Sequence, residues 1–142
     1  MSEDLPPDAD DPSIPDEELL YRRIPLQPPD NIQPTEVAGE YRPSSGNFRS
    51  SGPLSVDRAS MTTPEQTRDR GRPGIFHVAQ VPAKVARQCG CRLVKDPMPN
   101  NPAHILLFGN HDSGVGALNG KQAKAIARAA RIVLLSGTDH PQ

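Results

Sequence analysis

The chain has 142 residues, enough for one domain. Seventeen prolines and eleven glycines make up about a fifth of it, and only five residues are Phe or Tyr, so the core is small. No apolar run of about 18 residues is present, which excludes a membrane span. The acidic, proline-rich start lacks the basic and apolar parts of a signal peptide. We therefore expect a cytoplasmic protein that does not contact a membrane.

The net charge of −1 conceals an uneven distribution. Residues 1–18 hold eight acids and no Lys or Arg, whereas residues 19–142 hold nine acids against sixteen basic residues, a balance of +7. Such a segment either folds back on the basic body or only improves solubility. Because it is highly charged and poor in apolar residues, we expect residues 1–18 to form a disordered leader.

The first half of the body contains few regular elements. Residues 19–24 are apolar enough for a short strand or a turn of helix, and residues 54–57 alternate as a strand does. Between them, residues 25–53 hold six prolines and a Ser/Gly cluster, which predicts a long irregular segment. Thr63 and Pro64 are typical of the first positions of a helix.

The second half is more regular. We expect strands at 75–79, 92–95 and 103–108, and a helix from Pro82 that ends at Gly90. An amphipathic helix follows Gly120, with an alanine-rich apolar stripe, and residues 132–135 either finish it or form a last strand. Residues 136–142 are read as a tail. The pattern predicts one small α+β (or small α/β) domain at 19–135 with a C-terminal amphipathic helix.

A polar loop at 109–112, Gly-Asn-His-Asp, follows the strand at 103–108 and resembles the metal-binding segment of calcineurin-like metallophosphoesterases. A two-metal hydrolase needs several further ligands. The companion motifs Asp-x-His, Gly-Asp-x-x-Asp and Gly-His-x-His are missing. We therefore predict no metal and no cofactor, and interpret the segment as a loop with left-handed Gly109 and Asn110.

The glycine-rich segment at 114–121 resembles a phosphate loop, but its glycine spacing differs and Gln122 replaces the metal-binding hydroxyl. A glycine-rich entry to a helix still offers backbone N–H groups to an anion. Four basic residues, spaced for one face of that helix, adjoin it; the alternative is a solvated face. The anion-binding candidates are Gly114, Gly116, Gly120, Lys121, Lys124, Arg128 and Arg131.

The segment Leu20-Tyr-Arg-Arg23, the later Arg49 and Leu54-Ser-Val56 resemble the opening of RES-type toxins, which consume NAD. An arginine pair and a strand serine would suit a pyrophosphate. That chemistry also needs a glutamate, and no Glu follows Glu65, so Asp96 or Asp112 would have to replace it. His104, on an apolar strand, is typical of a satisfied core histidine.

Longer phrases resemble a widespread family of short, uncharacterised bacterial proteins. They are Leu20-Tyr-Arg-Arg23, Leu54-Ser-Val-Asp-Arg-Ala59, Thr63-Pro-Glu65, Asp96-Pro-Met-Pro-Asn-Asn-Pro-Ala-His104 and the basic helix ending at Val133. The resemblance covers roughly residues 19–134. It implies a bacterial cytosolic protein and brings no activity, ligand or site residue.

We expect a non-catalytic binding or regulatory module whose partner is a protein or another anionic molecule, a nucleic acid included. The alternative is a small enzyme acting on a phosphorylated or nucleotide (NAD-like) substrate. Its candidate catalytic residues are Arg22, Arg23, His104, His111 and Asp112. An enzyme would gather these groups in one cleft, whereas a binding module would scatter them.

Overall fold

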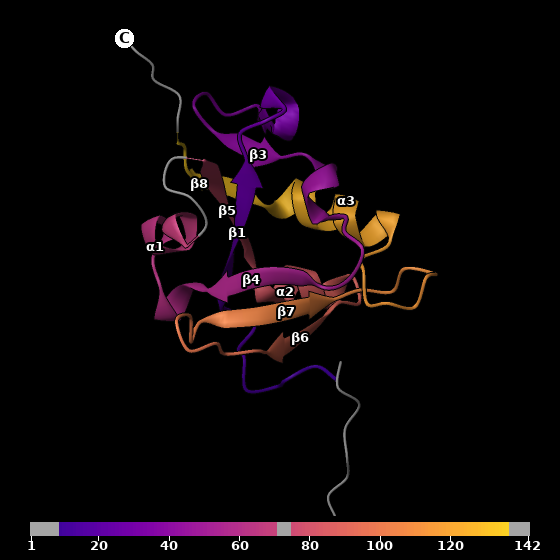
Figure 1. The fold of residues 1–142 in the computed structure, drawn as a ribbon. Helices are drawn as coiled ribbons and strands as arrows, with labels where there is room; N and C mark the ends of the chain where they lie inside the picture. The colour runs from indigo at the N-terminus through magenta and orange to yellow at the C-terminus, as the bar shows by residue number, and fades with distance from the viewer. Residues whose placement is uncertain (1–8, 71–74, 137–142) are drawn as a thin grey trace, which may run out of the picture.

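The computed structural model describes residues 9–70 and 75–136, which form a mixed domain built mainly of sheet (Figure 1). The main sheet has six strands in the order β6-β7-β4-β1-β5-β8, and all its pairings are antiparallel. The predicted α+β class is therefore confirmed. The strands of this sheet are β1 (Leu19–Pro25), β4 (Leu54–Arg58), β5 (Phe76–Pro82), β6 (Arg92–Lys95), β7 (His104–Phe108) and β8 (Arg131–Leu134).

Local capping signals explain where the helices begin and end. The side chain of Thr63 accepts a hydrogen bond from the Gln66 N–H at the start of α1 (Pro64–Asp69), and Asn119 does the same with Gln122 at the start of α3 (Gly120–Ala129). Helix α2 (Ala83–Gln88) ends two residues before Gly90, whose φ of +92° suits glycine. None of the described helices is long and apolar enough to cross a bilayer.

One face of the sheet carries the core. Alternate residues of the strands, such as Leu20, Val56 and Ile105, are almost fully buried, and they pack in one apolar cluster with Ala86 of α2 and Ile126 of α3. Helix α1 contacts β1 and β5 outside this cluster. Polar residues of α1 therefore lie near polar residues of β1 and β4.

The prediction that residues 1–18 are disordered is wrong for residues 9–18. Ile14 is completely buried in the core cluster, and the Asp11 N–H donates to the Leu93 carbonyl on β6. Arg87 of α2 contacts Asp10 and Asp16, with shortest distances of 3.2 and 2.8 Å. The acids of this segment thus meet cations of the body and cover the outer edge of β6. Residues 1–8 lie outside the described residues.

The segment 25–53, which was predicted to be irregular, contains short regular elements, including a small second sheet. Its strands β2 (Ile32–Pro34) and β3 (Tyr41–Pro43) pair antiparallel, and two 3-10 turns flank them, η1 (Pro29–Asn31) and η2 (Ser45–Phe48). A third 3-10 turn, η3 (Ala59–Met61), follows β4. Phe48 anchors η2 because its ring is buried in the core.

At the chain end the structure decides between the two alternatives for residues 132–135 in favour of a strand. This strand, β8, covers Arg131–Leu134, so the predicted C-terminal helix α3 is not the last element and Arg131 does not continue its basic face. Ser136, predicted to start a tail, is buried, and its N–H donates to Nδ1 of His77. The rest of the predicted tail, 137–142, is outside the described residues.

Glu18 links the start of the chain to β4 and η3. Its carboxylate accepts hydrogen bonds from Arg58 Nε (2.9 Å) and from the N–H (2.9 Å) and hydroxyl (2.8 Å) of Ser60. Burial opposes ionisation, but these bonds to Ser60 and Arg58 outweigh it and hold the pKa of Glu18 below its ordinary value of 4.5. A lowered pKa contributes stability above the unfolded-state pKa, and this stability is lost as the pH falls through the folded-state pKa.

Replacing Ile14 by Ala should lower the free energy of unfolding by about 2–5 kcal/mol, because a buried side chain leaves a cavity. The same change at Ile75, which is 44% exposed, should cost less than about 0.5 kcal/mol. Chemical denaturation of both variants measures the difference. Equal costs would contradict the packing of residues 9–18.

The Glu18→Gln variant should lose less stability than the parent between about pH 6 and pH 3, a range that includes the ordinary pKa of a glutamate. The reason is that the neutral amide does not titrate and so removes one source of acid destabilisation. Glu17→Gln is the matched control, since Glu17 is exposed. Thermal unfolding across this pH range is the measurement. Parallel profiles for the parent and Glu18→Gln would contradict the assigned pKa direction.

Candidate functional site

A cleft opens where β1 separates from β4. β1 pairs along all seven residues with β5, but with β4 only at Leu20↔Arg58 and Tyr21↔Asp57. Beyond Tyr21 the two strands diverge, and in Figure 1 β4 runs across the view while β1 runs up it. The divergence leaves backbone groups of β4 without a β1 partner.

Arg22 spans this gap. Its Nη1 donates to the Ser55 carbonyl of β4 at 3.1 Å, and its Nε donates to the Asn47 carbonyl of η2 at 3.2 Å. Burial, together with the nearby Arg23, lowers the pKa of Arg22 to about 10, so the guanidinium remains charged at neutral pH. Arg22 therefore ties β1, β4 and η2 together and keeps its remaining N–H donors at the cleft.

Arg23 supplies a second cation. Its guanidinium carbon lies 5.2 Å from the centre of the Phe76 ring, a cation–π distance. Among the described residues, neither Arg22 nor Arg23 forms an ion pair with a carboxylate. Two partly desolvated cations without a counter-charge are costly, and a bound anion would reduce that cost.

Asp57 organises the opposite wall. Its Oδ2 accepts from Thr67 Oγ1 (2.8 Å) and Arg70 Nη1 (2.6 Å), and its Oδ1 accepts from Asn101 Nδ2 (2.9 Å). Asp57, Thr67 and Asn101 are buried. The network neutralises Arg70 and fastens the β6–β7 turn to β4. The buried Oδ1 of Asn101 has no partner among the described residues.

His104 stands at the start of β7, at the end of this turn. Its Nδ1 lies 3.0 Å from Asp96 Oδ2 and 3.1 Å from the Asp96 carbonyl, so Nδ1 carries the proton and donates it to Asp96. No described residue forms a hydrogen bond with Nε2. In this tautomer Nε2 is a free acceptor, the arrangement that a general base requires.

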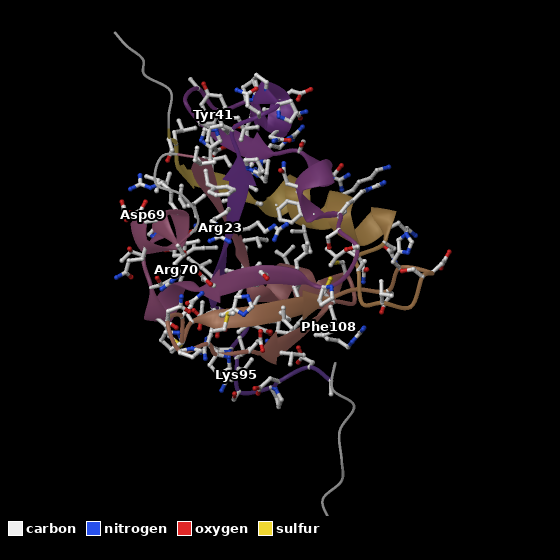
Figure 2. All side chains as sticks on the ribbon, in the orientation of Figure 1. Arg23, Tyr41, Asp69, Arg70, Lys95 and Phe108 are labelled. Atoms are coloured by element: carbon white, nitrogen blue, oxygen red, sulfur yellow. The ribbon has the colours of Figure 1, made fainter. Side chains whose placement is uncertain are left out.

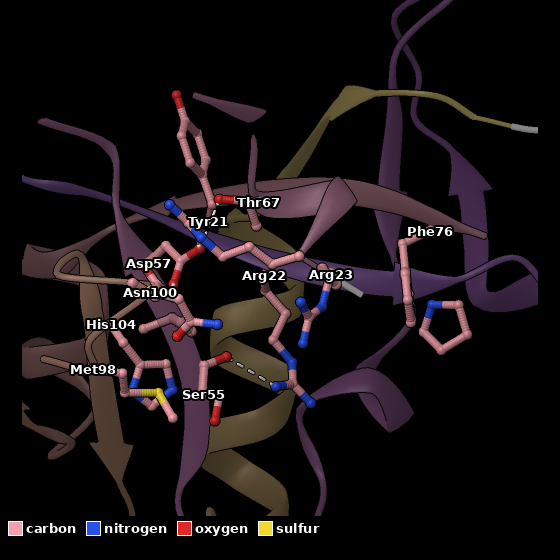
Figure 3. A pocket seen from close by; sticks show the side chains of 14 residues that line it. Tyr21, Arg22, Arg23, Ser55, Asp57, Thr67, Phe76, Met98, Asn100 and His104 are labelled. Atoms are coloured by element: carbon pink, nitrogen blue, oxygen red, sulfur yellow. Dashed lines mark hydrogen bonds and ion pairs between the residues drawn. The ribbon is translucent and has the colours of Figure 1, made fainter. Parts of the chain in front are cut away.

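These groups enclose one cavity of about 460 Å³, within the range of small-molecule sites. Figure 3 shows the arginines reaching into it from β1, with His104 and Met98 across the opening. Figure 2 labels Arg23 and Arg70, two of the cations that line it. We call it the β1/β4 cleft; its lining includes Tyr21, Arg22, Arg23, Pro25, Ser55, Val56, Asp57, Thr67, Arg70, Phe76, Met98, Asn100, Asn101 and His104.

Three of the five predicted catalytic residues meet in this cleft, namely Arg22, Arg23 and His104. His111 and Asp112 do not: both are exposed in the loop after β7, where His111 Nδ1 accepts from the Ser113 N–H. The expectation that His104 is a satisfied core histidine is wrong, because it lines the cleft. His104 therefore joins the cleft from the beginning of β7, since the turn from Asp96 folds back on β4.

The predicted anion-binding residues lie elsewhere. Gly114 and Gly116 have positive φ, whereas the loop residues Gly109 and Asn110 do not. Lys121, Lys124 and Arg128 are exposed on α3, which begins at Gly120. The prediction that all four basic residues share one helical face is wrong for Arg131, which lies in β8 with its Nε 3.4 Å from Glu40 Oε1.

Sequence reasoning missed Asp57 and Arg70 and considered Asp96 only as a replacement for the toxin glutamate. A recognisable signal existed for the pair of Asp96 and His104: a proline-rich turn joins two apolar strands, and an antiparallel hairpin brings its two ends together. Of the other residues that carry the RES-type resemblance, Ser55 lines the cleft and Arg49 does not. Among the described lining residues the one acid is Asp57, already occupied by its partners.

No three His, Cys, Asp or Glu side chains of the described residues gather as a metal site would need. Comparisons with protein-family models, with curated proteins and with solved structures find no match to the chain. The site must therefore be interpreted from its own chemistry.

The Asp57→Asn variant should lower the free energy of unfolding by about 1–3 kcal/mol, because an amide cannot accept from Thr67, Arg70 and Asn101 together. Asp69→Asn provides the control: Asp69 forms an ion pair of 2.7 Å with Arg68, close to the 2.6 Å of Asp57 with Arg70, but at the surface, and no measurable change is expected. Denaturant titration compares the two. An unchanged free energy of unfolding for Asp57→Asn would contradict the hydrogen-bond network of Asp57.

Proposed function

We propose that the protein binds a phosphorylated small molecule of the nucleotide class in the β1/β4 cleft and hydrolyses it. The observation that carries this proposal is the meeting of Arg22, Arg23 and His104 in one cavity. This is the arrangement that distinguishes an enzyme from a binding module with scattered polar groups. Of the two functions that the sequence left open, a binding module and a small enzyme, it favours the enzyme.

The charge of the cleft supports a phosphate ligand. Arg70 is neutralised by Asp57, whereas Arg22 and Arg23 have no carboxylate partner among the described residues. Guanidinium groups donate in a planar fork that matches two oxygens of a phosphate. A phosphate between the two arginines would restore the missing negative charge.

The size and the apolar lining support an organic group attached to the phosphate. A cavity of about 460 Å³ has room for more than a phosphate, and its lining includes Tyr21, Phe76 and Met98. Aromatic rings provide flat surfaces for a base. The nucleotide class also agrees with the RES-type resemblance of the Leu20-Tyr-Arg-Arg23 segment, two of whose arginines line this cleft.

His104 is suited to act as the base. Asp96 holds the Nδ1 proton, so Nε2 can take a proton from a water molecule whose oxygen attacks phosphorus. The bond from phosphorus to the leaving oxygen then breaks, and the protonated His104 returns its proton to that oxygen. Arg22 and Arg23 would stabilise the charge on the phosphate oxygens during this exchange.

Calorimetry with ADP, ADP-ribose and NAD tests the binding half of this proposal, with adenosine as the ligand that lacks phosphate. At least one phosphorylated ligand should bind, adenosine should bind far more weakly, and Arg23→Gln should weaken the binding about tenfold, the loss of one charge-assisted hydrogen bond. Arg68→Gln, outside the cleft, is the control and should not change the affinity. Equal affinity for adenosine and ADP would contradict a phosphate site.

Product analysis of the same mixtures tests the catalytic half. The parent protein should convert a bound ligand, whereas His104→Gln should bind it with nearly unchanged affinity and release no product. Asp96→Asn should slow the conversion, because it removes the acceptor that fixes the tautomer of His104. A ligand that binds in the cleft but is never converted would contradict catalysis and leave a non-catalytic binding module.

A further inference from the structure

We infer that the protein has a second anion-binding site, for a single phosphate group, in a hollow between α3 and the β3–η2 segment. The hollow has a volume of about 240 Å³ and shares no lining residue with the β1/β4 cleft. Helix α3 packs beside η2, as Figure 1 shows, so the two walls are held in contact. Its polar lining comes from Gln33, Arg42, Ser44, Ser45, Lys124 and Arg128.

All the charged side chains that line the hollow are basic. Arg42, Lys124 and Arg128 line it, and no acid does. Among the described residues, the side chains of these three cations form no ion pair or hydrogen bond, although the backbone carbonyl of Arg128 accepts from Arg131 Nη1 at 2.8 Å. Other cations of the chain behave differently: Arg131 approaches Glu40, and Arg87 approaches Asp10 and Asp16. Three neighbouring cations without a counter-charge repel one another, and an anion among them would remove this repulsion.

The donors face one another across the hollow. Lys124 and Arg128 stand four residues apart on α3, hence on the same face, and Arg42 comes from β3. Ser44 Oγ accepts from Asn47 Nδ2 at 3.0 Å, so its own proton is free to be donated into the hollow. Ammonium, guanidinium and hydroxyl donors together suit the several acceptor oxygens of a phosphate.

The shape favours one phosphate over an extended polyanion. The cations converge on a concave surface about half the size of the cleft, and the neighbouring Lys121 does not line it. The phosphate could belong to a free phosphate ester or to a polynucleotide backbone, which share this chemistry. A backbone would also contact Lys121, and its binding would weaken steeply with salt.

Titration of ¹⁵N-labelled full-length protein with inorganic phosphate, and separately with a duplex oligonucleotide, tests the site by NMR. Phosphate should shift the amide signals of Ser44, Ser45 and Arg128. Lys124→Gln and Arg128→Gln should each weaken phosphate binding about tenfold, the loss of one charge-assisted contact. Lys121→Gln, the same change one turn earlier on the same helix, should leave the affinity measured from these signals unchanged, and so should Arg68→Gln, which lies outside both sites.

The oligonucleotide can also bind at this site. It should then shift the same signals with a steep salt dependence, and Lys124→Gln should weaken oligonucleotide binding more than Lys121→Gln does. This result would support the site and assign its phosphate to a nucleic acid. Two results would overturn it. One is the absence of phosphate and oligonucleotide shifts at the hollow. The other is equal weakening by Lys121→Gln and Lys124→Gln, which indicates a diffuse basic surface. The fold of each variant is checked by its unfolding midpoint.

Discussion

The contacts of Arg22 with the carbonyls of Ser55 and Asn47 are the junction on which the site depends. A sheet whose central strands diverge exposes unpaired backbone groups, and these must find partners. Here a side chain from β1 provides them, and it also links η2 to the sheet. The junction has an electrostatic consequence, because the group that closes the gap is a cation with no carboxylate partner among the described residues. In the proposed function, the side chain that closes the gap is therefore also one that would bind the anion.

The rest of the cleft is held rigidly around this cation. Asp57 fastens α1 through Thr67 and Arg70 and the β6–β7 turn through Asn101, so two elements distant in sequence meet at one carboxylate. The turn in turn positions His104 against Asp96. A site whose donors are fixed by other hydrogen bonds loses little entropy on binding a ligand. The second cluster of cations, on α3 and β3, lies apart from this network, so the two sites can be separated by substitution.

Local signals were sufficient for much of the fold. The capping residue Thr63, the glycine after α2 and the apolar stripe of α3 act within a few residues of one another, and the elements they predict are present. Non-local contacts decided the rest. Residues 9–18 are ordered because Ile14 and Asp10 meet partners far along the chain, including Leu93, which composition cannot reveal. The three-residue strands β2 and β3 are too short for alternation to show. Of the cleft, the arginine pair and His104 were predicted. The network of Asp57, the contact of Asp96 with His104 and the exposure of His111 depend on tertiary pairing, which the sequence pattern does not show.

An anion bound between Arg22 and Arg23, as proposed, would be detected most directly through the side-chain Nε–H signals of these two arginines. A ¹H–¹⁵N spectrum of the arginine Nε–H groups, recorded during titration with ADP and with adenosine, distinguishes the cleft from every other basic surface. The predicted result is a saturable shift of the Arg22 and Arg23 signals with ADP and none with adenosine, while the signal of Arg68 stays in place. Shifts confined to other arginines, or identical shifts with both ligands, would contradict the claim.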